Sequence, residues 1–290
     1  MTLLEAAFLV VFWGWAVCAI LFLRHTVLPR LPLTVTPAAR HLPFETVHFQ
    51  ATDGVPLEGW TISTEPAAPW ILLCHGLGSN RSDLVEIAAG LHAAGFNLLL
   101  IDFRGHGGSS GRSTSFGWQE RHDLEGALAF LGQQSDLPVR PIGVYGISMG
   151  AAVALLVAAE DERIGAVAAD STYTNLEASL SRHLRLLYPW LPPIPFRWFM
   201  LLTYRFRFGV WPRRISPETA VDELAARPVL FIHGSADIRM PVEGIRPLAA
   251  RADSHALWVV EGAGHLEAFA TYHDAYLFRL ATFFRSSLLG

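Results

Sequence analysis

The segment PIGVYGISMGAAVALLVAAE, residues 141–160, decides which fold this sequence can adopt. It begins with a short apolar run typical of a buried strand and ends in an alanine-rich stretch typical of a helix. Between them lies GISMG, residues 146–150, which matches the pattern G-x-S-x-G. In the order strand, turn, helix, this pattern is a nucleophile elbow, whose glycines allow the sharp turn that exposes the serine. We therefore predict that Ser148 is a nucleophile at the positive end of the following helix.

Strand-like and helix-like segments alternate on both sides of this motif. Short continuous apolar runs suit strands that are buried on both faces, and repeated strand–helix units predict a mostly parallel, doubly wound sheet of the α/β class. In such a sheet the functional site lies at the carboxyl ends of the strands. An antiparallel pair at 46–50 and 57–63 precedes the buried runs, which occupy 70–74, 98–101, 141–145, 164–169, 228–232 and 256–260.

A serine hydroxyl needs a base, and in this arrangement the acid and the base follow the serine along the chain. His265 lies between the last predicted strand and the last helix, and Asp237 follows the strand PVLFIH through a short loop. We predict these two as base and orienting acid. His106 is the weaker alternative base and Asp170 the alternative acid, whereas His233 is interpreted as structural.

An oxyanion intermediate needs two backbone donors. The first predicted donor is the N–H of Met149, directly after the nucleophile. The second should come from the loop HGLG, residues 75–78, which follows a buried strand. We assign it to the N–H of Leu77, whose neighbouring glycines permit the tight turn.

Composition narrows the function classes. Of 290 residues, 51% are hydrophobic and 17% charged, which excludes a disordered chain. The net charge of −4 does not favour nucleic-acid binding. All 22 basic residues are arginine, so neither a Schiff-base lysine nor a Walker A lysine is present. No metal-ligand spacing or dinucleotide fingerprint appears, and we expect no cofactor and no metal.

The run AAFLVVFWGWAVCAILFL, residues 6–23, carries no charge. As a helix it would be about 27 Å long, close to the hydrocarbon thickness of a bilayer. A cleaved signal peptide is the alternative, but no basic residue precedes the run. We expect a single-pass, uncleaved anchor over residues 1–25. Arg24, Arg30 and Arg40 follow the run and place the rest of the chain in the cytoplasm by the positive-inside rule.

The composition of the remaining chain indicates a linker, a core in two parts and an insertion. A proline-rich linker, residues 26–44, leads to a core in two parts, residues 45–170 and 228–290, separated by an insertion at 171–227. From residue 178 to 217 the insertion holds seven arginines and many aromatic residues but no acid. We expect a helical cap over the active site, with its aromatic residues inward. A second, compatible interpretation is contact between this basic, aromatic cap and the membrane interface.

Several of these motifs together resemble the α/β-hydrolase superfamily, and more closely the serine aminopeptidase-like and Bem46-like hydrolases. The resemblance covers about residues 45–285. It implies an α/β-hydrolase fold, a Ser148–Asp237–His265 triad and a cap in the insertion, and it makes residues 102–109 a structural turn. The matching motifs, in family order, are HGLG at 75–78, DFRGHGGS at 102–109, GISMG at 146–150, HGSAD at 233–237 and GH at 264–265.

The functional expectation is a membrane-anchored serine hydrolase that cleaves carboxylic esters or thioesters through an acyl-enzyme. A small-molecule or lipid-like ester with an apolar acyl group is the expected substrate, and the membrane is the expected partner through residues 6–23. The alternatives are a peptidase or an acyltransferase with the same triad, and an inactive binding module on the same fold.

Overall fold

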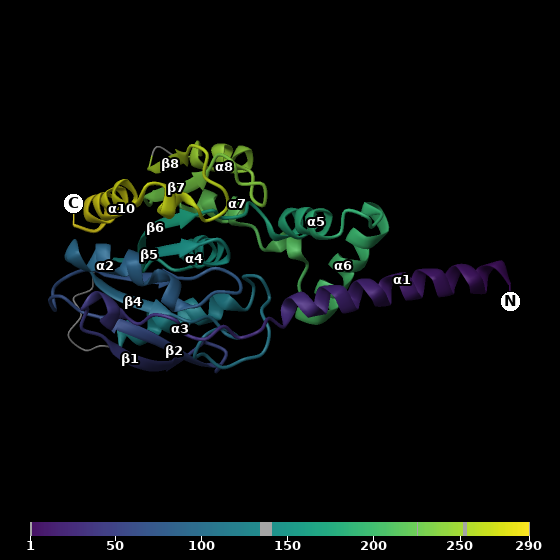
Figure 1. Ribbon diagram of the computed structural model, residues 1–290, viewed down its shortest axis with the longest axis horizontal. Coiled ribbons are helices and arrows are strands. Elements are labelled where there is room, and N and C mark those ends of the chain that lie inside the picture. The colour runs from purple at the N-terminus through teal and green to yellow at the C-terminus, as the bar shows by residue number, and fades with distance from the viewer. Residues whose placement is uncertain (1, 134–140, 225, 252–253, 290) are drawn as a thin grey trace.

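The computed structural model describes residues 2–133, 141–224, 226–251 and 254–289. Met1 and Gly290, at the outer limits of the first and last predicted segments, lie outside these ranges. Figure 1 shows a twisted sheet flanked by helices, with helix α1 (Leu3–Thr26) projecting away from it beside the helices of the cap.

The sheet has eight strands in the order β1-β2-β4-β3-β5-β6-β7-β8. Strand β2 pairs antiparallel with β1 and β4, and all other neighbours are parallel. The predicted α/β fold with a mostly parallel sheet is therefore confirmed. The strands are β1 (Glu45–Gln50), β2 (Pro56–Ile62), β3 (Trp70–Cys74), β4 (Asn97–Ile101), β5 (Ile142–Ile147), β6 (Ile164–Asp170), β7 (Val229–Gly234) and β8 (His255–Val260).

Helices cover both faces of the sheet because successive strand residues point to opposite faces. Leu72 belongs to the cluster under α3 (Glu120–Gly132), α4 (Met149–Glu160) and α8 (Val242–Ala249). Its neighbours Ile71 and Leu73 belong to the cluster under α2 (Val85–Ala93) and α10 (His273–Leu288). All three side chains are fully buried, so the continuous apolar runs reflect a sheet that is covered twice.

The linker lies along the surface of the core. It contains one 3-10 turn, Pro37–Arg40, and is otherwise irregular up to β1. The side-chain amide of Asn80 donates to the carbonyls of Leu31 and Pro32, at 3.2 and 3.1 Å. The guanidinium of Arg30 donates to two carbonyls of the loop after β4. These hydrogen bonds attach the first part of the linker, a few residues after α1, to the core.

The insertion between β6 and β7 forms helices α5 (Leu176–Leu187), α6 (Pro193–Phe208) and α7 (Pro217–Ala220), with 3-10 turns at Pro212–Arg214 and Val221–Leu224. Leu180 of α5 and Tyr204 of α6 share a third apolar cluster with Phe22 of α1 and with Phe116. The cap and the end of α1 are therefore packed together, beyond the carboxyl ends of the parallel strands (Figure 1).

The start of α4 lies so close to the end of β3 that only glycine fits there. A Cβ at Gly150 would lie 2.4 Å from the carbonyl oxygen of Cys74. We expect Gly150→Ala to cost about 1–3 kcal/mol, because backbone must move to relieve the clash. Gly132→Ala is the control: its Cβ would meet no atom nearer than 3.8 Å, and alanine favours a helix. Thermal unfolding in detergent should show a lower midpoint for Gly150→Ala alone, and equal midpoints would contradict this packing.

Candidate active site

Ser148 occupies a strained turn between β5 and α4. Its φ and ψ are 51° and −111°, in a region that residues other than glycine seldom adopt. Its N–H donates to the carbonyl of Asp170 at 2.8 Å, which holds the turn in place. Since α4 begins at Met149, the serine lies at the helix N-terminus with a half-buried side chain.

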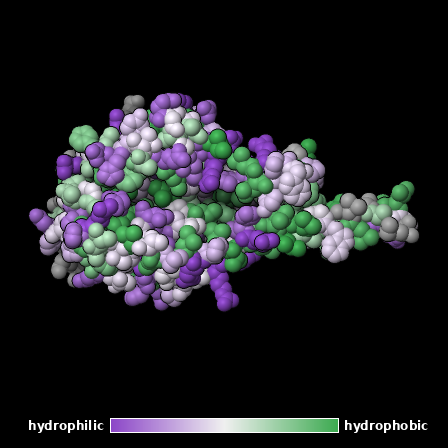
Figure 2. Space-filling view, viewed as in Figure 1, coloured by the Kyte–Doolittle hydropathy of each residue, from purple (hydrophilic) through white to green (hydrophobic). Residues whose placement is uncertain are grey.

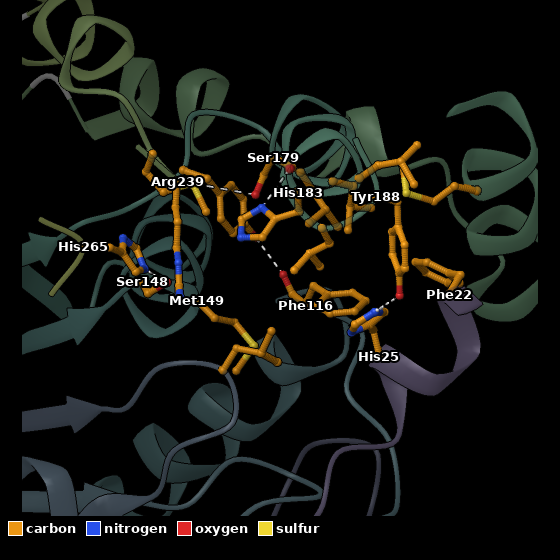
Figure 3. Close-up of a pocket in the computed structure, with 18 of the residues that line it drawn as sticks. Phe22, His25, Phe116, Ser148, Met149, Ser179, His183, Tyr188, Arg239 and His265 are labelled. Carbon is orange, nitrogen blue, oxygen red and sulfur yellow. Dashed lines mark hydrogen bonds between the residues drawn. The ribbon is translucent and has the colours of Figure 1, made fainter. Parts of the chain in front are cut away.

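The hydroxyl of Ser148 is in hydrogen-bond contact with His265. The Oγ lies 3.0 Å from Nε2 of His265, and Nδ1 of the same ring lies 2.7 Å from Oδ2 of Asp237. Asp237 comes from the loop after β7 and His265 from the loop after β8. The structure thus brings together the three side chains that were predicted as nucleophile, base and acid. Figure 3 shows Ser148 and His265 next to each other at one end of a pocket.

Asp237 is held as a carboxylate. Burial opposes its ionisation, but the hydrogen bond to His265 and the backbone N–H of Met240 outweigh it and hold the pKa of Asp237 below its usual value. The N–H groups of Arg239 and Met240 donate to Oδ1 at 2.9 Å each. One carboxylate oxygen is therefore fixed by backbone, and the other faces the imidazole.

Asp170, the alternative acid, has other partners. Its carboxylate accepts hydrogen bonds from the hydroxyls of Tyr276 at 2.7 Å and Ser171 at 2.8 Å. Burial raises the pKa of Asp170 above its usual value. Tyr276 in turn lies 2.8 Å from the hydroxyl of Tyr145, so this network ties α10 to the sheet below Ser148.

His106 and His233, the two other histidines considered in the sequence, each support a loop. His106 accepts a hydrogen bond at Nε2 from the N–H of Gly78, at 3.1 Å. His233 contacts the carbonyl of Met240 through Nε2, and the same nitrogen lies 3.6 Å from Oδ2 of Asp237. His106 therefore supports the loop after β3, and His233 supports the loop that carries the acid.

The loop after β3 passes over Ser148. A Cβ at Gly76 would lie 3.6 Å from the Cβ of Ser148. Among the described residues, the N–H groups of Leu77 and Met149 donate to no other part of the chain. Both predicted oxyanion donors thus lie in segments next to the nucleophile and are free to bind a ligand.

His75 holds this loop from below. Its Nε2 accepts from the N–H of Phe103 at 3.0 Å, so Nδ1 carries the proton that is donated to the carbonyl of Gly76 at 2.7 Å. The ring is fully buried, and burial, together with the nearby His106, lowers the pKa of His75 to about 3. His75 is therefore a neutral structural residue.

A largely apolar pocket of about 220 Å³ extends from Ser148. It reaches from Ser148 and His265 to Phe22, His25 and Tyr188 at its other end (Figure 3). None of these last three residues was singled out from the sequence as a pocket residue. The α1 residues lie more than a hundred positions before the nucleophile, and an apolar helix pattern gives no signal of what the helix packs against. In the described ranges, no group of three or more His, Cys, Asp or Glu could hold a metal ion.

Comparisons with known proteins agree with this architecture. Residues 69–199 match the family model described as the alpha/beta hydrolase fold. The uncharacterized protein YqkD of Bacillus subtilis is 30% identical over 228 residues, which cover 77% of this chain and 73% of YqkD. The chain belongs to the α/β-hydrolase family. The predicted resemblance is thereby confirmed, and the family supports a hydrolase.

Two further relatives of this α/β hydrolase bear on its architecture. The protein Bem46 of Schizosaccharomyces pombe is 26% identical, over 71% of this chain and 64% of Bem46. A solved esterase of Pyrococcus furiosus has a TM-score of 0.75 and 26% identity, over 91% of this chain and 98% of the esterase. The likeness to this esterase covers nearly the whole chain.

The buried His75 predicts a loss of stability in acid. Its pKa is about 3 in the folded chain against 6.5 when exposed, so the unfolded chain binds the extra proton between these values. The free energy of unfolding should therefore fall as the pH decreases below about 6.5. We expect His75→Gln to be less stable at neutral pH but to lose less of its remaining stability on acidification.

The measurement is urea unfolding in detergent between about pH 7 and pH 4. His48→Gln changes an exposed histidine in β1 and should keep the acid sensitivity of the native chain. An unchanged pH slope in His75→Gln would contradict the role of His75.

Proposed function

We propose that this protein is a membrane-anchored serine hydrolase that cleaves carboxylic esters or thioesters with an apolar acyl group. The observation that carries the proposal is the continuous contact from Ser148 through His265 to Asp237 at the end of an apolar pocket. The esterase of Pyrococcus furiosus, which has the same fold over nearly its whole length, supports an ester as the substrate.

The geometry suggests the order of events. As the Oγ of Ser148 attacks the carbonyl carbon, Nε2 of His265 takes the hydroxyl proton. The carbonyl oxygen becomes an oxyanion that accepts hydrogen bonds from the N–H groups of Met149 and Leu77. When the intermediate collapses, His265 returns the proton to the leaving alcohol or thiol, and an acyl-Ser148 ester remains.

Water completes the cycle through the same groups. His265 takes a proton from the water that attacks the acyl carbonyl, and a second tetrahedral intermediate forms. Its collapse releases the acid, and His265 returns the proton to Oγ of Ser148. Throughout, the Asp237 carboxylate holds Nδ1 protonated and stabilises the imidazolium, which its lowered pKa allows at neutral pH.

The lining of the pocket favours an apolar acyl chain. Beyond the serine and the imidazole, its walls are mainly leucine, methionine and aromatic side chains. They come from α1 and α5, from Met200 of α6, and from the loops around the site. Arg239 lies at the Ser148 end, and the polar side chains of His25 and Tyr188 at the far end are hydrogen-bonded to each other. An ester whose carbonyl lies at Ser148 would place its acyl chain against these apolar walls.

Helix α1 supports the membrane part of the proposal. It is long and apolar enough to cross a bilayer, with a mean hydropathy of 2.5 over its most apolar 18 residues. A signal sequence meets the same criteria, and we favour an anchor because α1 is packed against the cap. Arg24 lies in the last turn of α1, and Arg30 and Arg40 follow the helix, which supports a catalytic domain on the cytoplasmic side.

A fluorophosphonate probe tests the nucleophile. The native chain in detergent should be labelled, because such probes react with an activated serine, and Ser148→Ala should lose the label. Ser286→Ala removes an exposed hydroxyl that donates to the carbonyl of Phe283, and this variant should be labelled like the native chain. A folded native chain that takes no label, or a Ser148→Ala variant that keeps it, would overturn the proposal.

Asp237→Asn tests the acid. The amide cannot stabilise imidazolium and would favour the wrong tautomer of His265, so we expect ester hydrolysis to fall by about 10³–10⁴-fold with little change in thermal midpoint. Asp274→Asn removes a fully exposed carboxylate and should be as active as the native chain. Steady-state kinetics with a soluble chromogenic ester give the comparison, and near-native rates in Asp237→Asn would exclude Asp237 as the acid.

A further inference from the structure

Helix α1 is part of the pocket wall as well as an extension of the chain. Cys18, Leu21, Phe22 and His25 all line the pocket that begins at Ser148. They lie on successive turns of one face of the helix, as their spacing requires. The pocket is thus enclosed on one side by the segment that we propose to be the membrane anchor.

Specific contacts hold this half of α1 against the cap. The indole N–H of Trp15 donates to Oγ1 of Thr203 at 3.1 Å. Nε2 of His25 lies 2.9 Å from the hydroxyl of Tyr188. These hydrogen bonds lie nearly three helical turns apart, so the register of α1 against α5 and α6 is determined at two points.

Aromatic packing between these two points buries Phe22. Its ring lies 6.0 Å from that of Phe116 and 6.0 Å from that of Tyr204, and only 6% of the residue is exposed. The wall is therefore a packed structure, and its shape is determined by the same side chains that attach α1 to the domain.

The position of these contacts along α1 places the cap at the bilayer. The helix lies against the cap as early as Gly14, where a Cβ would lie 3.5 Å from the ring of Phe199. Residues 3–13 alone are about 16 Å long as a helix, roughly half of the 30 Å hydrocarbon thickness. The apolar run of residues 6–23 can lie in hydrocarbon only if α6 and the adjoining pocket wall lie at the membrane too.

The exposed side chains of the cap are consistent with a position at the membrane. Figure 2 shows apolar surface on α1 and on the part of the molecule next to it. On the cap, large apolar side chains are exposed at the end of α5 and along α6: Leu187, Trp190, Ile194, Trp198 and Phe206. The same stretch, residues 178–217, holds seven arginines and no acid, a composition typical of segments that bind the membrane interface, although Arg197 is paired with Glu177 of α5.

We propose that α1 forms one wall of an acyl-chain site, in which a long-chain ester resident in the bilayer is bound between α1 and the cap helices α5 and α6. This inference rests on the proposed function and adds the substrate class. Ser148 and His265 lie at one end of the pocket and Phe22 and His25 at the other (Figure 3). A short acyl group bound at Ser148 would not reach α1, whereas a long one would lie along it.

The chain offers a matched pair of positions for the test. Leu21 is half-buried and lines the pocket, whereas its neighbour Ile20 is 60% exposed and does not. A tryptophan at position 21 would occupy space needed by a long chain, and a tryptophan at position 20 would face lipid. Both substitutions add the same side chain to the same turn of the helix.

The experiment uses the full chain in detergent micelles with p-nitrophenyl butyrate and p-nitrophenyl palmitate. For Leu21→Trp we expect the palmitate-to-butyrate ratio of kcat/KM to fall by about tenfold or more, because the indole would occupy space that the long acyl chain needs. Butyrate hydrolysis and fluorophosphonate labelling are measured for each variant, so that the ratio separates a loss of long-chain binding from a general loss of activity. Ile20→Trp should keep the native ratio. When the palmitate ester is embedded in phosphatidylcholine vesicles with the reconstituted chain, Leu21→Trp should again hydrolyse it more slowly than the native chain and Ile20→Trp do.

The same measurements distinguish failure of the proposed function from failure of the proposed role of α1. A native chain that hydrolyses neither ester and takes no label contradicts the proposed function itself. Normal butyrate hydrolysis with equal palmitate ratios in Leu21→Trp and Ile20→Trp overturns only the role of α1. If Leu21→Trp fails to fold, Leu21→Ala decides: loss of wall contacts should lower the palmitate ratio by about threefold or more, and an unchanged ratio overturns the inference.

Discussion

The close approach of α4 to the end of β3 is the constraint on which the rest of the site depends. Gly150 lies against the carbonyl of Cys74, and this contact brings Ser148 under the loop that follows β3. The positive φ of Ser148 is maintained by packing on both sides and by its hydrogen bond to Asp170. Two potential oxyanion donors therefore lie in segments next to the serine hydroxyl before any substrate binds, which is the preorganisation that electrostatic stabilisation requires.

The buried ionisable groups around this turn have different hydrogen-bond partners and different roles. Asp237 is kept charged by backbone N–H groups and faces the imidazole, whereas Asp170 is bound by Tyr276 and Ser171 within the core. His75 is kept neutral by burial and supports the loop after β3. Each of these side chains is buried, and what distinguishes them is the set of hydrogen-bond partners that the neighbouring loops provide.

The pocket connects the catalytic centre to the cap and to the second half of α1. The core ends where the parallel strands end, and beyond it the cap and the second half of α1 share one apolar cluster. Tethering alone would not require α1 to pack against the cap. The contacts that Trp15, Phe22 and His25 make with the cap therefore indicate a structural role for the helix. The shared packing makes the proposed anchor and the proposed substrate site a single structural unit.

The sequence by itself determined the local features: the strand–turn–helix around Ser148, the buried strands, the apolar N-terminal helix and the positions of Asp237 and His265 in loops after strands. These follow from periodicity, glycine placement and chain order, which act over a few residues. Only the tertiary structure decided that Asp237 rather than Asp170 contacts the imidazole, and that α1 lines the pocket. Chain order favours Asp237 over Asp170 but does not show which carboxylate reaches the imidazole, and an apolar helix pattern does not indicate what the helix packs against. Both outcomes depend on how distant segments pack.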